Sequence, residues 1–205
     1  MDQLQVIFLW PFRLCSCAET DRQKRFVIFC LEGRLCTVQG KAKQQGKEMI
    51  MDYKENAEIV KKYLDANDWH CDMKDTGSAV AFTGGVNAPR GVFGSFKFVV
   101  LVEDDIVQNV TTLPVSMRDK LAEGAEYVAR VNYPLKRGRM NIDFRDGEVN
   151  YHFGVPMAAV KADTDGVLAE LLCLPGVMLA KYGDGVAKIL FGGIDPKTAY
   201  EQCDD

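Results

Sequence analysis

The sequence lacks any surplus of positive charge. Its 205 residues hold 25 Lys and Arg against 29 Asp and Glu, which gives a net charge of −4. A protein dedicated to nucleic acid needs clustered cations for the phosphates, so this composition disfavours that class. Histidine is also scarce: His70 and His152 leave few neutral bases for catalysis. The hydrophobic share of 47% and the charged share of 26% are otherwise those of an ordinary globular protein.

Long apolar runs and a cysteine framework are missing as well. No unbroken apolar run approaches the roughly 20 residues that cross a bilayer. After residue 50 the cysteines are Cys71, Cys173 and Cys203, an odd number at wide spacing that predicts no disulfide framework. We therefore expect a reducing compartment, by default a cytoplasmic one, and no membrane association.

Residues 1–50 differ in texture from the rest of the chain. They are richer in Lys and Arg than in Asp and Glu, and they show no sustained helical or strand period. A secretory signal is disfavoured, because Asp2 stands where basic residues are expected and Pro11 interrupts the apolar run. A lipoprotein cleavage box at residues 14–17 is disfavoured for the same reasons. The spacing of the cysteines does not fit a zinc module. The segment is therefore predicted to be a poorly ordered extension.

A mis-assigned translation start is a further account of this extension. Residues 46–48 can be encoded by a purine-rich string that resembles a bacterial ribosome-binding site, just ahead of Met49 and Met51. Translation is then expected to begin at Met51 or, as the lesser alternative, at Met49, and residues 51–205 to form a single domain. Recovery of a peptide from before residue 49 in the native protein would refute this start.

Residues 51–113 predict one helix followed by four strands. Asp52 with Glu55 forms a capping box for a helix over residues 53–66. Strands are predicted at 69–73, 80–82, 96–102 and 106–113, with short connections that favour an antiparallel meander. The glycine-rich stretch 84–94 between the second and third strands is interpreted as a long hairpin loop.

A second helix and a hairpin follow. Ser116 with Asp119 predicts a helix through residue 131. Asp146-Gly147 is typical of a two-residue hairpin turn, which would pair Arg145 with Glu148. In that register the apolar side chains, Phe144 included, share one face. The polar ones share the other face, and His152 lies in solvent beside Asn141.

The last third of the chain is predicted to be helical. Apolar residues recur at helical spacing over 168–190, and Pro175-Gly176 is expected to kink or split this helix. Gly192-Gly193 ends it, and Asp195 with Pro196 begins a short helix. The whole order, α-β-β-β-β-α-β-β-α-α, predicts an α+β fold with one antiparallel sheet and flanking helices.

No residue set predicts a reaction. The glycines of 84–94 match neither the Walker nor the Rossmann spacing. His70 and Cys71 are neighbours on a predicted strand, so they point to opposite faces and cannot pair as base and nucleophile. The acids 103–105 are interpreted as a solvated turn. We expect no catalytic residue, no metal and no cofactor.

A basic cluster is the best candidate for binding a partner. Arg130, Lys136, Arg137 and Arg139 surround Tyr133, a combination that suits an acidic peptide or RNA. The acidic remainder of the chain makes RNA the weaker of the two. Phe93 completes the set of candidate partner-binding residues as an aromatic side chain in the predicted loop.

Two blocks of the sequence carry a resemblance to a known family. Residues 130–151 contain an Asn132 that ends a helix, a Gly138 that begins a hairpin, and an Asp-Gly-Glu-Val turn at 146–149. Residues 182–200 run from a tyrosine through Phe-Gly-Gly-Ile-Asp-Pro. Both blocks resemble the bacterial YbjN family, and the likeness covers about residues 53–202.

The resemblance implies a fold like that of type III secretion chaperones, which commonly dimerise and bind partner polypeptide. Members of the family are also labelled sensory-transduction regulators, and no enzymatic activity is implied. The long glycine-rich stretch 84–94 and Pro175 depart from the family pattern.

Three functions are compared on these grounds. The leading hypothesis is a non-enzymatic protein-binding module, chaperone-like or regulatory, acting as a monomer or homodimer. It would take a partner segment on an uncovered sheet face or an exposed strand edge. The alternatives are a small-ligand-binding protein or enzyme with its site near 84–94, and a nucleic-acid-associated regulator that uses residues 130–139.

Overall fold

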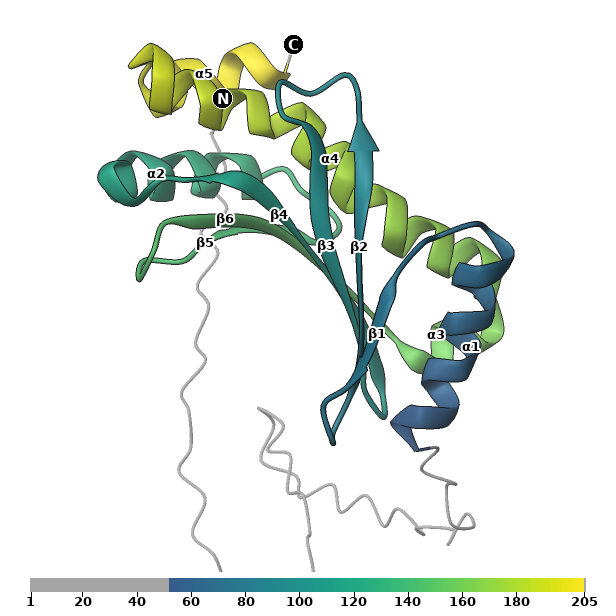
Figure 1. The fold of residues 1–205 in the computed structure, drawn as a ribbon. Coiled ribbons are helices and arrows are strands. Elements are labelled where there is room, and N and C mark those ends of the chain that lie inside the picture. Colours follow the sequence, from purple (N-terminus) through teal and green to yellow (C-terminus); the bar gives the residue numbers. More distant parts are fainter. Residues whose placement is uncertain (1–51, 205) are drawn as a thin grey trace, which may run out of the picture. The chain divides into compact units, whose positions relative to one another are not determined.

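The computed structural model describes residues 52–204, and these residues fold into one antiparallel sheet with helices packed on it (Figure 1). The six strands lie in the order β1-β2-β3-β4-β6-β5. The chain divides after Glu48, so every described element belongs to the unit Met49–Asp205. The predictions for residues 1–50 and for the translation start lie outside the described residues.

The elements confirm the predicted α+β class and the predicted order, with a short 3₁₀ turn η1 and a short helix α3 added. They are α1 (Tyr53–Ala66), β1 (Asp72–Asp75), β2 (Val80–Ala88), β3 (Gly94–Val102), β4 (Ile106–Ser116), η1 (Arg118–Lys120), α2 (Leu121–Asn132), β5 (Arg139–Ile142), β6 (Glu148–Pro156), α3 (Met157–Ala162), α4 (Thr164–Gly192) and α5 (Pro196–Asp204).

α1 begins and ends where the sequence predicts. The Asp52 carboxylate accepts a hydrogen bond from the Lys54 N–H at 3.3 Å, which caps the helix. The helix is fixed to the β3–β4 turn by Asn56, whose side chain is buried and donates to the carbonyl of Asp104 at 2.8 Å. The Asp104 carboxylate accepts from the Tyr53 N–H at 3.0 Å. This acidic turn therefore helps to hold α1 and is not merely solvated.

The first strand starts later than predicted. β1 is Asp72–Asp75, so Trp69, His70 and Cys71 precede it, and the argument that His70 and Cys71 face opposite sides of a strand does not apply. Trp69 instead packs edge-on against Phe98, with ring centroids 5.6 Å apart. As a large aromatic residue, Trp69 favours a strand by propensity, but its contact with Phe98 determines its position.

The predicted loop at 84–94 is wrong, because most of it is strand. β2 continues to Ala88 and β3 begins at Gly94, which leaves only residues 89–93 as the connection. Gly84 lies opposite Phe98 in this hairpin. A Cβ at position 84 would lie 2.7 Å from the Phe98 ring. Glycine is therefore used here for close packing inside a strand and not for a turn.

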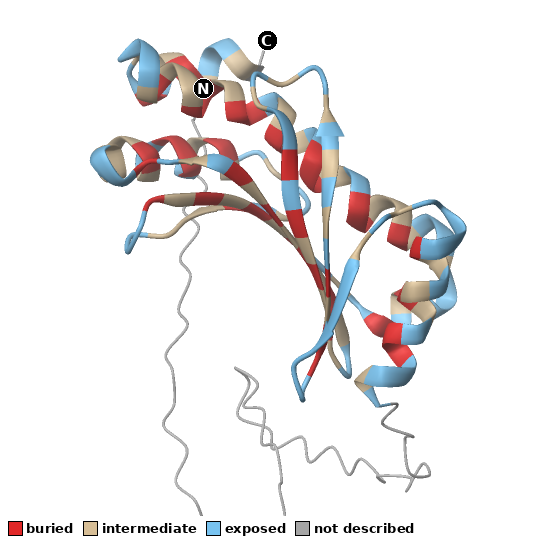
Figure 2. Ribbon diagram, viewed as in Figure 1, coloured by how far each residue is buried: buried red, intermediate tan, exposed pale blue. Residues whose placement is uncertain are grey.

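One face of the sheet carries the helices and the core. Figure 1 shows α2 and α4 lying across the same face. Along β3 the side chains of Phe96, Phe98, Val100 and Val102 are buried, and Figure 2 shows the same alternation on the neighbouring strands. A period of two with one apolar set buried means that each strand gives its alternate side chains to the helices.

α4 runs through Pro175 as one helix of 29 residues, so the predicted split is wrong. Proline has no N–H, so the carbonyl of Leu171, four residues earlier, has no donor within the helix. The Asn109 side chain on β4, itself fully buried, donates to that carbonyl at 2.9 Å. A sheet residue thus supplies the hydrogen bond that the proline removes.

Among residues 52–204, α4 is also the one helix whose length and composition would allow it to cross a membrane. Glycines and a few charged residues interrupt its apolar residues, so the helix contains no unbroken apolar run of that length. The same length and composition are found in core helices, and Leu168, Leu171, Leu179, Val186 and Ile189 are buried in the core here.

The β5–β6 hairpin has a different register from the predicted one. Met140 lies opposite Tyr151 and Ile142 opposite Val149, a shift of two residues from the predicted pairs. The loop between Asp143 and Glu148 has four residues, because the Gly147 N–H donates to the Asp143 carbonyl at 2.7 Å. A shift of two keeps every strand side chain on its predicted face, but it leaves Phe144 in the loop and exposed.

The second predicted helix also begins later. Ser116 is the last residue of β4, where its hydroxyl accepts from the Arg118 N–H at 3.1 Å. The turn η1 follows, and α2 proper starts at Leu121. The last short helix begins as predicted, since the Asp195 carboxylate accepts from the Thr198 N–H at 3.0 Å.

Candidate functional site

The face of the sheet opposite the helices has a half-buried apolar centre. Ala81, Val99, Leu101 and Val110 point to this side, because each alternates with a buried residue of its strand. The strand register places Val99 directly between Thr83 on β2 and Val110 on β4. These residues form the open face, a name used below for this side of the sheet.

Residues 96–102 are apolar at every even position, and Val99 and Leu101 add apolar residues at odd positions of the same strand. The sequence therefore contains the signal for a second apolar face. A strand that is apolar on both faces is usually covered on both. Within residues 52–204, helices lie over only one of them.

A chain of polar side chains borders this apolar centre. His152 on β6 bonds through Nδ1 to the Arg139 guanidinium at 2.8 Å and through Nε2 to the Gln108 amide oxygen at 2.7 Å. The Gln108 amide in turn donates to the Glu103 carboxylate at 3.3 Å. Arg139 can only donate, so Nδ1 of His152 is an acceptor and the proton is on Nε2.

The position of His152 corrects the prediction that it lies in solvent beside Asn141. His152 pairs across the strands with Arg139, while Asn141 pairs with Asn150. Burial, and then the charge of Arg139, hold the pKa of His152 below its usual value. The imidazole is therefore neutral near pH 7 and serves as a link between two strands.

Because the pKa of His152 is lower in the folded than in the unfolded state, the unfolded state binds more protons at mildly acidic pH. The free energy of unfolding is therefore expected to fall as pH drops below the unfolded value of about 6.5. Replacing His152 by Gln removes the titrating group, so the difference in stability between wild type and variant should shrink from pH 7.5 to pH 5.5. Urea unfolding at both pH values measures it, and an unchanged difference would contradict the assignment.

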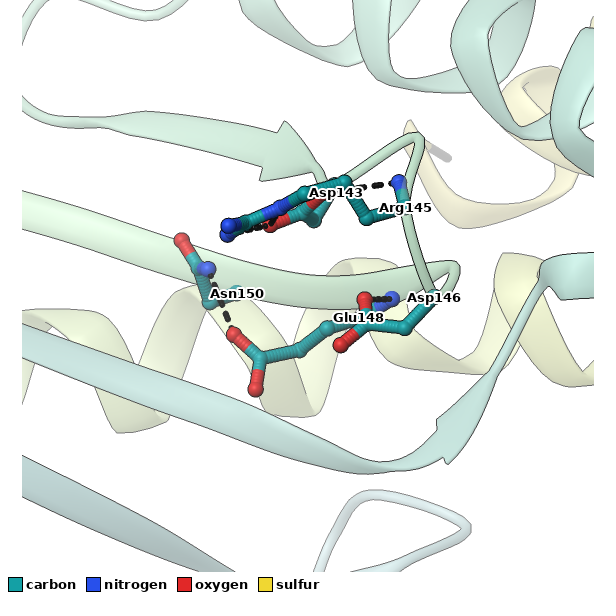
Figure 3. A network of polar contacts seen from close by, with 5 residues as sticks. All are labelled: Asp143, Arg145, Asp146, Glu148 and Asn150. Carbon is teal, nitrogen blue, oxygen red and sulfur yellow. Dashed lines mark hydrogen bonds and ion pairs between the residues drawn. The ribbon is translucent and has the colours of Figure 1, made fainter.

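A second polar network lies at the β5–β6 end of the open face (Figure 3). Asp143 pairs with Arg145, whose hydrogen bonds lower the pKa of the Asp143 carboxyl to about 2. The Asn150 amide donates to Glu148 at 3.0 Å and accepts from Asn141 at 3.0 Å. These side chains come from one hairpin, so its turn sequence positions them without long-range packing.

The two outer strands of the sheet are protected from pairing. On β5, the Asn132 amide donates to the Met140 carbonyl at 2.8 Å and accepts from the Met140 N–H at 2.8 Å. It thereby occupies the groups that another strand would use. β1 is only four residues long, fully exposed, and carries Asp72, Lys74 and Asp75. Short, charged edge strands resist the addition of a further strand.

The predicted basic cluster is divided and largely paired. Arg130 bonds to Glu126 at 2.7 Å, Arg137 pairs with Glu170, and Arg139 lies on the open face against His152. Exposed ion pairs of this kind stabilise little, but they lower the local positive potential. Lys136 is exposed, and so is Tyr133, at 94%.

The structure does not bring Phe93 into this cluster. Phe93 follows β2, is half-buried against the core and packs near Gly183 of α4. The nearby Phe96 is buried on β3. These aromatic residues therefore support the hairpin and offer no docking surface beside Tyr133.

Residues 52–204 contain no group of three His, Cys, Asp or Glu side chains that could hold a metal ion. His70 is exposed, and its Nδ1 lies 2.9 Å from the Asp68 carbonyl. Burial raises the pKa of the Cys71 thiol, which favours the unreactive protonated form.

Comparison with known proteins gives no match: no family model fits the chain, no curated protein is similar to it, and no solved structure resembles it. The YbjN resemblance and the type III secretion chaperone-like fold thus stay predictions that rest on the two sequence blocks.

Proposed function

We propose that this protein is a non-enzymatic binding module, chaperone-like or regulatory, that receives an extended polypeptide segment on the open face of its sheet. The observation that carries the proposal is the half-buried apolar centre at Val99, Leu101 and Val110, which no helix within residues 52–204 covers. Patches of apolar residues with a polar rim are typical of protein-binding surfaces.

The rim favours a polypeptide as the occupant. Gln108, Asn141 and Asn150 present amides, each with two N–H donors and two oxygen lone pairs. Each therefore keeps a donor and an acceptor position for a peptide backbone beyond the hydrogen bonds described above. Cations and anions alternate around the same centre, with Lys97 and Arg139 against Glu103 and Glu148. Such mixed charge suits a chain of mixed sequence and not a polyanion. The YbjN resemblance supports the same reading, because the fold that it implies binds polypeptide.

The face is a better docking place than an edge of the sheet. Asn132 occupies the outward backbone groups of Met140, and β1 is short and charged. Strand addition at β5 would first displace the Asn132 contacts, and β1 offers only a short, charged strand. A segment lying across the face makes side-chain contacts and leaves both edges intact.

The experiment is a quantitative capture from lysate of the source cells with the tagged full chain, at moderate salt and after nuclease treatment. We expect one near-stoichiometric protein partner. The double variant Val99→Glu with Leu101→Glu is expected to lose at least about tenfold of it, because two carboxylates would be desolvated in the contact.

Phe191→Glu is the matched control. Phe191 is an exposed apolar residue of α4, 75% accessible, on the helix side of the sheet. It receives the same kind of change, and circular dichroism shows whether each variant remains folded. Retention of the partner by the folded open-face variant, or capture of no protein at all, would count against the proposal.

The nucleic-acid reading is not favoured. Arg130 and Arg137 are engaged by carboxylates, and Arg139 is turned to His152. Few cations of residues 130–139 therefore remain for phosphates, whose binding depends on several contacts.

A further inference from the structure

A groove lies on the side of the sheet that bears the helices, away from the open face. Its volume is about 660 Å³, and it is enclosed by the end of β2, the connection to β3, α4 and the C-terminal part of α5. Figure 1 shows the β2–β3 tip standing beside α4, near the end of α5. This volume is within the range of small-molecule sites.

Small apolar residues create the space. Ala88, Gly176 and Ala180 line the groove where larger side chains would fill it, and Val86 and Val177 complete its apolar wall. Val177 is 62% exposed and lies in this apolar wall, beside the half-buried Val86 and Ala88. The groove therefore offers apolar surface to something outside the fold.

The wall of the groove is held in place. A Cβ at Gly91 would lie 3.0 Å from the Ala180 backbone, so the β2–β3 tip rests directly on α4. The Val92 N–H donates to the Asp184 carboxylate at 2.8 Å and joins the same two elements. A site that is formed before binding loses less conformational entropy when it is filled.

The charge of the rim selects the ligand. Arg90 lies on the β2–β3 connection and Lys188 on α4, and both line the groove. The one carboxylate in the lining, Asp184, is engaged by the Val92 N–H. A groove with apolar walls and cations at its rim is complementary to a molecule that has an apolar part and one negatively charged group.

We propose that this groove binds a small amphipathic anion, an unbranched acyl carboxylate being the simplest form, with its chain against Val86, Ala88 and Val177 and its carboxylate toward Arg90 and Lys188. The site is independent of the open face and of the polypeptide proposed to bind there.

The experiment titrates the full chain with decanoate, below its micelle concentration, by isothermal calorimetry. Saturable binding of one decanoate is expected, and decan-1-ol, which lacks the charge, should bind at least about tenfold more weakly. Vesicles of an anionic phospholipid are a separate arm, and no enrichment on them is expected. Binding to vesicles without binding of decanoate would overturn the proposal in favour of a lipid surface.

A thiol readout locates the ligand. Cys173 is exposed and lines the groove, whereas Cys71 lies outside it. Bound decanoate is expected to slow the alkylation of Cys173 by N-ethylmaleimide, followed peptide by peptide with mass spectrometry, and to leave Cys71 unchanged. Equal rates at Cys173 with and without decanoate would overturn the placement.

Two variants test the residues. Arg90→Glu with Lys188→Glu is expected to weaken decanoate binding at least about tenfold, through loss of attraction and added repulsion. Arg118→Glu with Lys62→Glu makes the same change in net charge on exposed residues outside the groove and the open face, and its affinity should stay within about twofold. Equal effects of the two pairs would mean that net charge alone governs binding, which contradicts the site.

Discussion

Replacing Gly138 by alanine is expected to lower the free energy of unfolding by about 2–5 kcal/mol. Gly138 has a φ of +63°, a conformation that costs an L-residue roughly 1–2 kcal/mol. A Cβ there would also lie 2.5 Å from the ring of Tyr151. Tyr151 is fully buried and donates its hydroxyl to the Arg137 carbonyl, so the ring has no room to move, and such overpacking costs about 1–3 kcal/mol more.

Gly193→Ala is the matched control for this prediction. Gly193 ends α4 with the same φ of +63°, but no atom lies within 4 Å of where its Cβ would be. Its replacement should cost only the backbone strain. The difference between the two variants in urea unfolding isolates the Tyr151 contact. Equal losses would show that the ring yields without cost.

Asn109 and Pro175 are expected to be energetically coupled. In the wild type, Asn109→Leu leaves the buried Leu171 carbonyl without a donor, and a loss of about 2–3 kcal/mol is expected. In a Pro175→Ala background the new N–H at position 175 can donate to that carbonyl. The same Asn109→Leu change should then cost at least about 1 kcal/mol less, which a double-mutant cycle measures.

Val149→Ala is the control for the cycle. Val149 is buried, but it lies four residues along β6 from Phe153, the residue that pairs with Asn109. Its effect should add to that of Pro175→Ala. If Asn109→Leu also proved additive with Pro175→Ala within about 0.5 kcal/mol, Asn109 would have no part in carrying α4 past the proline.

Local signals in the sequence predict most of the elements. The capping box at Asp52 and the Asp195-Pro196 pair place two helix starts correctly, because the deciding hydrogen bonds join residues that are two or three positions apart. That α4 continues through Pro175 could not be predicted from such local signals. Its missing hydrogen bond is replaced by Asn109, which is distant in sequence.

Several differences between the predicted and the observed elements lie at glycines. The sequence predicts a loop at Gly84 and Gly85, but both are in β2, where the ring of Phe98 requires a glycine at position 84. At the hairpin, the Asp146-Gly147 pair indicated the correct turn region but not its length. The four-residue loop depends on hydrogen bonds from Asp143 and on contact with the residues around Arg118. Such contacts are visible only in the folded chain.

The candidate sites were harder to predict than the fold. Arg130, Arg137 and Arg139 are close in sequence, yet each meets a different partner, and two of those partners come from elsewhere in the fold. The walls of the groove beside α4 come from four separate parts of the chain, so no single stretch of the sequence indicates it. Small residues such as Ala88 and Ala180 carry no chemical signal in a sequence.

The amide of Asn132 also bears on how the protein behaves at high concentration. By binding both outward backbone groups of Met140, it imitates a neighbouring strand at one side of the sheet. Another copy therefore cannot pair with Met140 at this edge, and at the other side it meets the carboxylates of β1. Stacking of sheets into fibres needs a strand edge as a template. Copies of this protein would consequently associate through side-chain contacts and not through pairing of strand edges. Such an assembly would be closed and small, and it would not grow into a fibre.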